Sequence, residues 1–222
     1  MEHFKEYNWQ VDLKKSGKLP SLGLTSGSTY VIDPKRLVFT LSRYKFISKM
    51  FDGFDNVLEV GCGDGFATRI VRVSVNSLTG IDIEREFIED AKSRLDENLP
   101  IEFKVHNILE GPLGGTFDGI YSLDVLEHIP ASMQNIYLEN ILHSLSDDGV
   151  LIIGMPSIES QEYASGKGNN GHINCQSGRD LRDSLKKYFK NVFLFSMNDE
   201  VVHTGYEKMA HYILCVCTSK KG

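Results

Sequence analysis

The chain has 222 residues, of which 41% are hydrophobic, and this composition suits one α/β domain with a full core. Its formal net charge of −6 provides no basic footprint, which argues against a nucleic-acid partner. The first residues lack the apolar core of a secretory signal, and no apolar run is long enough to cross a membrane. We therefore expect a cytoplasmic protein without a membrane partner.

The order of the predicted elements indicates a doubly wound α/β fold that occupies residues 1–222 as one domain. Residues 1–32 are mixed in composition and include a turn-rich stretch, so we expect an N-terminal arm or lid there. A helix is predicted to begin at Asp33-Pro34, because an aspartate N-cap followed by proline is a helix start signal. Seven short apolar runs predict strands at 57–61, 78–82, 101–105, 117–123, 150–153, 192–195 and 211–216.

Helices are predicted where apolar residues recur on one face, at 84–95, 130–145 and 177–189. Ser177 is the expected cap of the last of these helices. A turn at 146–149 precedes the fifth strand, and a polar, glycine-rich insertion at 156–176 follows it. A long irregular segment in a compact domain is usually functional, so we expect this insertion on the substrate side.

The first predicted strand runs directly into three alternating glycines, Gly61, Gly63 and Gly65. Glycine has no Cβ, so the backbone can adopt positive φ there and approach a ligand closely. A dinucleotide fingerprint would place its third glycine at the position of Phe66, which argues against NAD. The alternative is a tight strand-to-helix turn that binds no ligand.

A carboxylate, Asp82, ends the second predicted strand about twenty residues after Gly61, where a mononucleotide-binding fold places the acid that binds the ribose hydroxyls. Asp82 is therefore the expected ribose ligand. The alternative role for Asp82 is an N-cap of the helix that begins near Glu84.

Two segments resemble class I S-adenosylmethionine-dependent methyltransferases. Glu59 and the three glycines resemble their motif I, acidic-x-Gly-x-Gly-x-Gly, and the segment 123–130 resembles the Leu-Glu-His segment of the branch that includes ubiquinone-biosynthesis O-methyltransferases. The resemblance implies a Rossmann-like fold, with a seven-stranded, mostly parallel sheet and an antiparallel C-terminal hairpin. It also implies S-adenosyl-L-methionine as cofactor, held by Glu59, Gly61, Cys62, Gly63, Gly65, Asp82, Ile83, Asn107, Ile108 and Leu123.

One of these positions departs from the family pattern. The family places an aspartate after the third strand, where it binds the adenine amino group, whereas this chain has Asn107. An amide can still accept a hydrogen bond through its oxygen, so the adenine contact remains expected.

Methyl transfer to an alcohol requires positioning of the acceptor and removal of its proton, for which a neutral histidine is a suitable base. The resemblance makes His128 the first candidate, because the segment after the fourth strand lines the methyl-donor end of the cofactor site in this family. His172, in the polar insertion, is the second candidate. The alternatives are a structural hydrogen bond for His128 and a solvated loop side chain for His172.

Asp124, Glu127 and His128 would share one face if their segment were helical, because residues three and four apart are neighbours on a helix. The arrangement resembles the metal site of small-RNA 3′-terminal 2′-O-methyltransferases, and His172 could complete it. Such a ligand set favours Mn²⁺, Fe²⁺ or Zn²⁺ over Mg²⁺. Alternatively, the two carboxylates are helix-start residues favoured by the helix dipole.

Three functions fit this sequence. The first is O-methylation of a small hydroxylated metabolite, such as a sugar or a nucleotide-activated sugar, with a histidine base or metal assistance. The second is metal-dependent 2′-O-methylation of an RNA 3′ end, and the third is binding of S-adenosylmethionine without catalysis. The methyl acceptor, the choice between O- and N-methylation and the oligomeric state stay open at this point.

Overall fold

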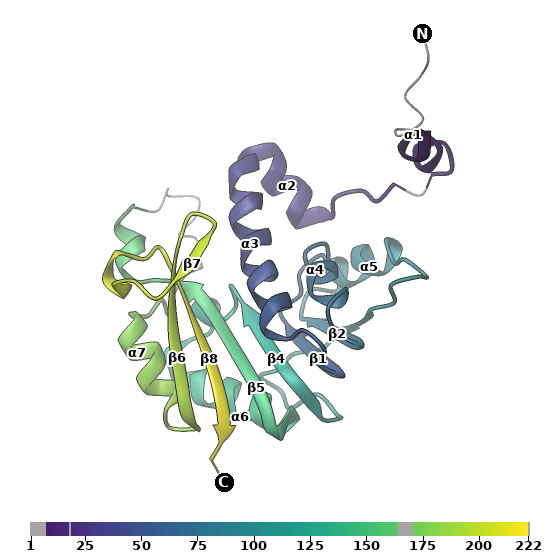
Figure 1. Cartoon of the computed structure of the whole chain (residues 1–222). Helices are drawn as coiled ribbons and strands as arrows, with labels where there is room; N and C mark the ends of the chain where they lie inside the picture. The colour runs from purple at the N-terminus through teal and green to yellow at the C-terminus, as the bar shows by residue number, and fades with distance from the viewer. Residues whose placement is uncertain (1–7, 18, 164–170, 222) are drawn as a thin grey trace.

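A computed structural model describes residues 8–17, 19–163 and 171–221 of the chain. Its described strands form one sheet in the order β3-β2-β1-β4-β5-β8-β6-β7 (Figure 1). The first five strands run parallel, whereas β8 is antiparallel to β5 and β6, and β7 is antiparallel to β6. The strands are β1 (Asn56–Val60), β2 (Ser77–Asp82), β3 (Glu102–Val105), β4 (Phe117–Leu123), β5 (Leu145–Pro156), β6 (Phe189–Asn198), β7 (Val201–His203) and β8 (Tyr212–Lys220).

The predicted fold class is confirmed, with one added strand. The sequence predicts seven strands, and the short strand β7 makes an eighth by pairing with the end of β6. The helices are α1 (Asn8–Lys15), α2 (Leu24–Ile32), α3 (Pro34–Met50), α4 (Thr68–Arg72), α5 (Arg85–Ser93), α6 (Gln134–Ser144) and α7 (Gly178–Leu185). Short 3-10 helices are η2 (Leu126–His128), η3 (Ala131–Met133), η4 (Glu159–Tyr163) and η5 (Glu207–Met209).

Helices cover both faces of the sheet and make two cores (Figure 1). On one face, α3, α4 and α5 bury side chains such as Ile47, Val71 and Ile88 against the sheet. On the other, α6 and α7 bury side chains such as Leu138 and Leu181. The parallel strands β1, β2 and β4 are buried along most of their length because helices cover both faces, whereas the edge strand β3 is largely exposed.

Local signals placed two helix starts correctly. The Asp33 carboxylate accepts a 3.1 Å hydrogen bond from the Lys35 amide, and Pro34 is the first residue of α3. Ser177 Oγ likewise accepts a 3.1 Å bond from the Asp180 amide at the start of α7. Both predicted caps are therefore confirmed, since each satisfies an amide that a helix start leaves without a partner.

Several predicted boundaries were wrong, and tertiary pairing explains two of them. The strand β5 includes the predicted turn at 146–149, because Leu145 already pairs with Phe117 before an irregularity in the ladder. The helix α7 ends before Phe189, which instead pairs with Lys220 at the start of β6. The predicted helix at 130–145 is divided into η3 and α6, and the helix predicted to end at residue 95 ends at Ser93. Part of the insertion, 164–170, lies outside the described residues.

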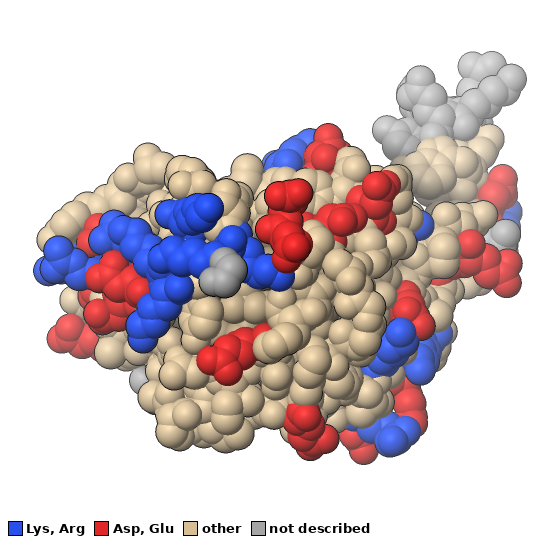
Figure 2. Space-filling view, turned by 90° about the horizontal axis from the view of Figure 1, so that it is seen from below, with Lys and Arg blue, Asp and Glu red and all other residues tan. Residues whose placement is uncertain are grey.

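Basic side chains gather at the edge of the sheet where β6 begins and β8 ends (Figure 2). Lys186, Lys220 and Lys221 lie together there: Lys221 Nζ donates to the Lys186 carbonyl, and Lys220 Nζ donates to the carbonyl of Leu145 at the start of β5. This edge holds the amino ends of the parallel strands, opposite the carboxyl edge where ligands bind in this type of sheet. In the described part of the chain, no helix is both long and apolar enough to span a membrane.

Candidate active site

A cavity of about 410 Å³ opens at the carboxyl edge of the parallel strands, beside β1 and β4. The chain order reverses between these two strands, which is the topological switch point where open α/β sheets bind ligands. Five of the predicted cofactor contacts line this cavity: Gly61, Asp82, Ile83, Asn107 and Ile108. The volume is in the range of small-molecule and cofactor sites.

All three glycines of the loop after β1 adopt positive φ, as predicted, at 81° for Gly61, 53° for Gly63 and 67° for Gly65. A Cβ on Gly61 would collide with the Val125 side chain, and one on Gly65 would collide with the Phe103 ring. Gly61 therefore needs both its backbone conformation and its lack of a side chain to fit beside the cavity.

Asp82 ties the glycine loop to the end of β2. Its Oδ2 accepts a 2.8 Å hydrogen bond from the Gly63 amide, and its Oδ1 accepts a 3.0 Å bond from the Glu84 amide. The bond to Glu84 closes a turn before α5 and is not a helix cap, because the N-cap of α5 is Glu84 and no described side chain caps that helix; the Asp82 carboxylate lines the cavity. A carboxylate has about four acceptor sites, so these two bonds leave capacity for ribose hydroxyls.

Asn107 is also engaged with its own turn while it lines the cavity. Its Oδ1 accepts a 3.1 Å bond from the Leu109 amide, and its Nδ2 donates to Glu110 Oε1 at 2.9 Å. The amide oxygen has a second lone pair for another donor.

The structure places the other predicted cofactor residues around the cavity rather than in its lining. Glu59 is buried behind the loop, where the Tyr44 and Tyr121 hydroxyls donate to its two oxygens at 2.7 and 2.8 Å. Burial raises the pKa of Glu59 to about 7. Cys62 and Leu123 are also buried, and burial raises the pKa of the Cys62 thiol. Glu59 thus links α3, β1 and β4 beneath the glycine loop.

At the other end of the cavity, the structure brings together Glu127, His128 and His172, whose potential ligand atoms all lie within 4.8 Å of one another. Glu127 and His128 belong to η2, directly after β4. The amides of Ile173 and Asn174 donate to the Glu127 carbonyl at 2.8 and 3.0 Å. These backbone bonds dock the end of the insertion against η2, and this docking is what carries His172 to His128.

Hydrogen bonds to carbonyl oxygens fix the tautomers of both histidines. His128 Nδ1 lies 2.9 Å from the Gly171 carbonyl oxygen, and His172 Nδ1 lies 3.0 Å from Gln161 Oε1. A carbonyl oxygen can only accept, so each Nδ1 carries the proton and each neutral ring keeps its lone pair on Nε2. Burial and the neighbouring His128 lower the pKa of His172, which favours that neutral form.

Glu127 is buried, and its Oε2 has no hydrogen-bond partner among the described residues. Burial, with the nearby charge of Asp124, raises the pKa of Glu127. An unpaired buried carboxylate oxygen is costly, so the cluster is arranged to receive a proton, a hydrogen-bond donor or a cation from outside.

Asp124 does not join this cluster, contrary to the predicted shared helical face. Its φ is 57°, and the 3-10 turn begins only at Leu126, so the helical spacing does not extend back to Asp124. Instead, its Oδ2 lies 2.6 Å from Arg43 Nη1 in α3, and the Arg43 guanidinium lies 3.7 Å from the centre of the Tyr212 ring. Arg43 was not predicted from the sequence, because no local motif marks an arginine whose partner is 81 positions away.

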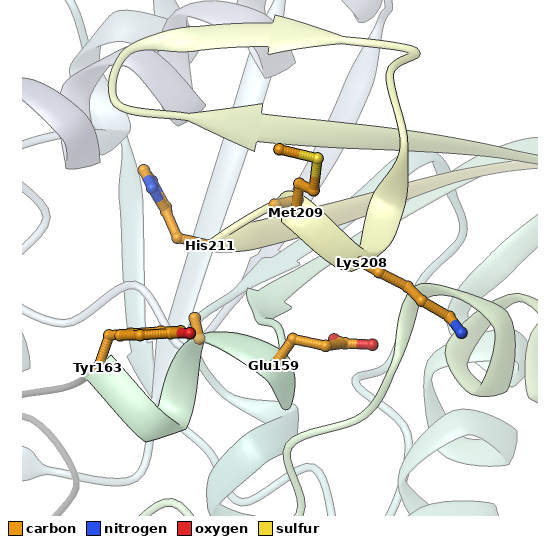
Figure 3. A pocket seen from close by; sticks show the side chains of 7 residues that line it. Glu159, Tyr163, Lys208, Met209 and His211 are labelled. Carbon is orange, nitrogen blue, oxygen red and sulfur yellow. The ribbon is translucent and has the colours of Figure 1, made fainter.

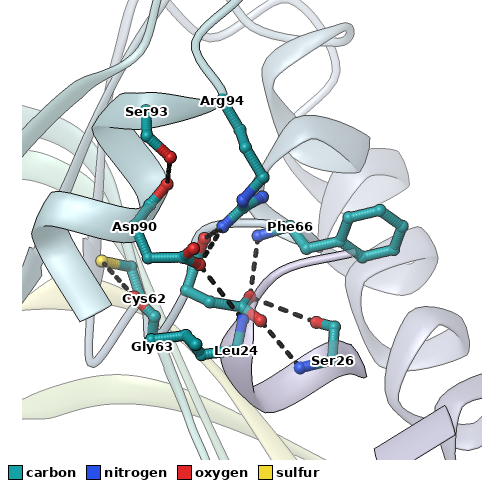
Figure 4. Close-up of polar contacts among 9 residues, drawn as sticks. Leu24, Ser26, Cys62, Gly63, Phe66, Asp90, Ser93 and Arg94 are labelled. Atoms are coloured by element: carbon teal, nitrogen blue, oxygen red, sulfur yellow. Dashed lines mark hydrogen bonds and ion pairs between the residues drawn. The ribbon is translucent and has the colours of Figure 1, made fainter. Parts of the chain in front are cut away.

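The segment before α3 is anchored on the glycine loop (Figure 4). Asp64 is buried, and it accepts bonds from the Ser26 amide at 2.7 Å and the Ser26 hydroxyl at 3.1 Å. Asp90 accepts a 3.1 Å bond from the Leu24 amide, and Arg94 links Asp90 to the Asp64 carbonyl. These partners satisfy the first amides of α2, which explains why a helix begins inside the stretch predicted to be turn-rich.

Comparisons with known proteins agree with this architecture. A family model described as a methyltransferase domain matches residues 33–191. A ubiquinone biosynthesis O-methyltransferase from Rickettsia canadensis is 27% identical over 145 residues, which cover 63% of this chain and 58% of that protein. The chain thus spans less than two thirds of the length of the first curated relatives.

Solved structures share the fold at low sequence identity. The N-methyltransferase NodS from Bradyrhizobium japonicum, in complex with S-adenosyl-L-homocysteine, has a TM-score of 0.60 and 17% identity, over 81% of this chain and 85% of that one. The methyltransferase domain of bacterial CtHen1 has a TM-score of 0.66 and 16% identity, over 81% of this chain and 98% of that one. The matched family model, the sheet order and the glycine loop show that this chain belongs to the class I S-adenosylmethionine-dependent methyltransferases.

Proposed function

We propose that this protein transfers a methyl group from S-adenosylmethionine to a hydroxyl oxygen of a small molecule, with His128 as general base. The observation that carries the proposal is the position of His128, which lines the cavity beyond the glycine loop and whose Nδ1 bonds to the Gly171 carbonyl, so that Nε2 is the basic atom of the neutral ring. An alcohol loses its proton as it attacks, and a base within reach accelerates such a step by about 10²–10⁴-fold.

The cavity suits the cofactor because its wall includes Gly61, whose lack of a Cβ lets the backbone pack against Val125 and approach a ligand closely. In this proposal Asp82 accepts bonds from the ribose hydroxyls, and Asn107 accepts one from the adenine amino group. Ile83 and Ile108 provide apolar contact to the adenine. When bound, the cofactor supplies a methyl group already activated by a sulfonium. The protein then has to hold the acceptor in line and accept its proton.

A metal-assisted variant is the second candidate, and the convergence of Glu127, His128 and His172 favours it. The two rings and the Glu127 carboxylate, whose Oε2 has no partner among the described residues, form a set of one carboxylate and two imidazoles. Zn²⁺, Mn²⁺ or Fe²⁺ suits such a set, and three protein ligands leave positions open for a hydroxyl. A metal there would lower the hydroxyl pKa and take over the role of the base.

A small acceptor is favoured over an RNA end by the position of the basic patch. Lys186, Lys220 and Lys221 lie at the amino edge of the sheet, opposite the cavity, whereas phosphate contacts supply most nucleic-acid affinity (Figure 2).

The test is methyl transfer from S-adenosylmethionine with an isotopically labelled methyl group to a panel of phenols, sugars, amines and a short RNA, read by NMR. The chemical shift of the labelled methyl distinguishes oxygen from nitrogen as its acceptor. We expect an O-methyl product from a small molecule, and its loss in His128→Asn. Transfer to nitrogen or to RNA would contradict the proposal, and cofactor binding without turnover on any acceptor would support a non-catalytic binding protein.

A further inference from the structure

A second cavity, of about 510 Å³, lies between η4 and η5 at the carboxyl edge of β5 (Figure 3). Glu159 and Tyr163 line it from η4, and Lys208, Met209 and His211 line it from the opposite side. Backbone bonds hold this region to the sheet, since the Ser157 amide donates to the His211 carbonyl at 3.1 Å. The backbone before η4 is therefore joined to the backbone after η5.

Its walls combine exposed apolar surface with an acidic residue. Tyr163 and Met209 are 84% and 77% exposed, so both present apolar surface that a ligand could cover. Glu159 is the acidic residue of the lining, and a carboxylate can accept a hydrogen bond from a ligand hydroxyl.

Two chains of contacts connect this cavity to the cofactor cavity. On one side, Gln161 of η4 bonds to His172, whose ring centre lies 5.1 Å from that of His128. On the other, Arg43 pairs with Asp124, which lines the cofactor cavity, and packs on Tyr212, the neighbour of His211. Contacting side chains thus link the lining of this cavity to His128 and Asp124 in the lining of the cofactor cavity.

The cavity also offers defined polar groups. The Asp199 amide donates to His211 Nδ1 at 3.4 Å, so the neutral ring carries its proton on Nε2 and can donate to a ligand oxygen. Lys208 adds an ammonium group that can pair with an anion. The Glu159 carboxylate is an acceptor, and His211 and Lys208 are donors. With the apolar surfaces of Tyr163 and Met209, these groups match a hydroxylated ring that carries a negative group.

We propose that this second cavity binds the methyl acceptor and that the acceptor is a sugar carrying a phosphate ester. Glu159 accepts a bond from a ring hydroxyl, Tyr163 and Met209 cover the C–H face of the ring, and Lys208 pairs with the phosphate. Another hydroxyl of the sugar reaches His128. There the new O–CH₃ bond forms as the S–CH₃ bond breaks, and the hydroxyl proton passes to His128 Nε2. The products are a methyl ether and S-adenosylhomocysteine.

This inference rests on the proposed function, and binding measurements can separate the two. Protein saturated with S-adenosylhomocysteine is titrated with glucose 1-phosphate, UDP-glucose and glucose, and binding is followed by saturation-transfer NMR. The first two probes distinguish a phosphate monoester from a nucleotide diphosphate. The variants are Glu159→Gln and Lys208→Met, with Glu162→Gln as the matched control, because Glu162 is an exposed residue of the same 3-10 helix that does not line the cavity.

We expect at least one phosphorylated sugar to bind, and Glu159→Gln to weaken its binding by about fivefold, because glutamine offers a neutral acceptor in place of the charged one. Lys208→Met should weaken binding of the phosphorylated sugar but not binding of glucose. Glu162→Gln should change the binding of neither compound. Equal binding by Glu159→Gln and Glu162→Gln, or binding of no sugar, would overturn the inference. O-methylation of a phenol without sugar binding would overturn only the acceptor assignment, whereas failure to bind S-adenosylhomocysteine would overturn the proposed function itself.

Discussion

The ring centres of His128 and His172 lie 5.1 Å apart with their planes inclined at 65°. The two residues are far apart in sequence, and they meet because the backbone after residue 171 docks on the Glu127 carbonyl. Each Nδ1 bonds to a carbonyl oxygen, so Nε2 is the basic atom of each ring in its neutral form. One neutral imidazole can act as a base, whereas two imidazoles beside a carboxylate can bind a metal. Variants of these residues and removal of metal distinguish the two roles.

Replacement of His128 by asparagine should lower kcat by about 10²–10⁴-fold and leave the affinity for S-adenosylhomocysteine unchanged, because the variant loses only the base. Initial rates and isothermal titration measure the two quantities. His143→Asn is the matched control, since that histidine is exposed on α6 and bonds to the carbonyl of Glu139. If His172→Asn lowered kcat as much as His128→Asn, the pair would be acting as metal ligands.

Removal of divalent metal by EDTA dialysis should leave methyl transfer unchanged if His128 acts as the base. Direct binding of Mn²⁺, followed by electron paramagnetic resonance, gives a second readout that does not depend on activity. If no metal site exists, Glu127→Gln should give the same Mn²⁺ signal as wild-type protein. Glu139→Gln is the control, because Glu139 is an exposed residue of α6. Loss of activity that Mn²⁺ restores, together with Mn²⁺ binding that Glu127→Gln abolishes, would instead show a metal site.

Replacement of Ser26 by alanine should loosen α2 from the glycine loop, because the Asp64 carboxylate loses the 3.1 Å bond from the Ser26 hydroxyl. One such bond contributes about 1 kcal/mol, so hydrogen exchange of the α2 amides should accelerate by about fivefold. Ser28→Ala is the control, since the Ser28 hydroxyl bonds only to the Thr25 carbonyl in its own helix. Equal exchange in the two variants would show that Asp64 does not hold this segment.

The buried Glu59 should make stability depend on pH. Burial raises its pKa from 4.5 to about 7, so the folded protein binds this proton more tightly than the unfolded chain does. The resulting stabilisation is complete below the unfolded pKa and is lost as the pH rises through the folded pKa. Relative to Glu59→Gln, wild-type protein should therefore lose about 3 kcal/mol in free energy of unfolding between about pH 5 and about pH 8.

Urea unfolding of both proteins across this range measures the difference. All other titrating groups are shared by the two proteins, so subtraction isolates Glu59. Glu200→Gln, at an exposed position after β6, is the control and should show no such trend. A constant difference between wild-type protein and Glu59→Gln would mean that the Glu59 carboxyl has the same pKa in the folded and unfolded states.

Features with a local cause were predictable from the sequence. The three glycines adopt positive φ because their loop must turn out of a buried strand, and Asp33 caps α3 because its carboxylate reaches an amide two residues away. The strand order follows from the alternation of strands and helices together with the family resemblance. The eighth strand was missed because its three residues, Val201–His203, are too few to give a periodic signal.

Features that depend on distant partners were not predictable. Arg43 meets Asp124 across 81 positions, and Ser26 meets Asp64 across 38, with no motif that links either pair. The helical face predicted for Asp124, Glu127 and His128 was wrong because Asp124 adopts positive φ, and its amide donates to Gly154 on the neighbouring strand. The cavity beside Glu159 depends on two 3-10 helices brought together by β5 and β8, which strand periodicity alone cannot place.

The most direct test of the central claim is isothermal titration of the protein with S-adenosylhomocysteine and, separately, with NAD. The account predicts that S-adenosylhomocysteine binds and NAD does not. It also predicts that Asp82→Ala weakens the binding by about tenfold or more, because the variant loses both the proposed ribose contacts and the bond that holds Gly63. Binding of NAD, or binding of S-adenosylhomocysteine that is unchanged in Asp82→Ala, would contradict the assignment of this cavity to the methyl donor.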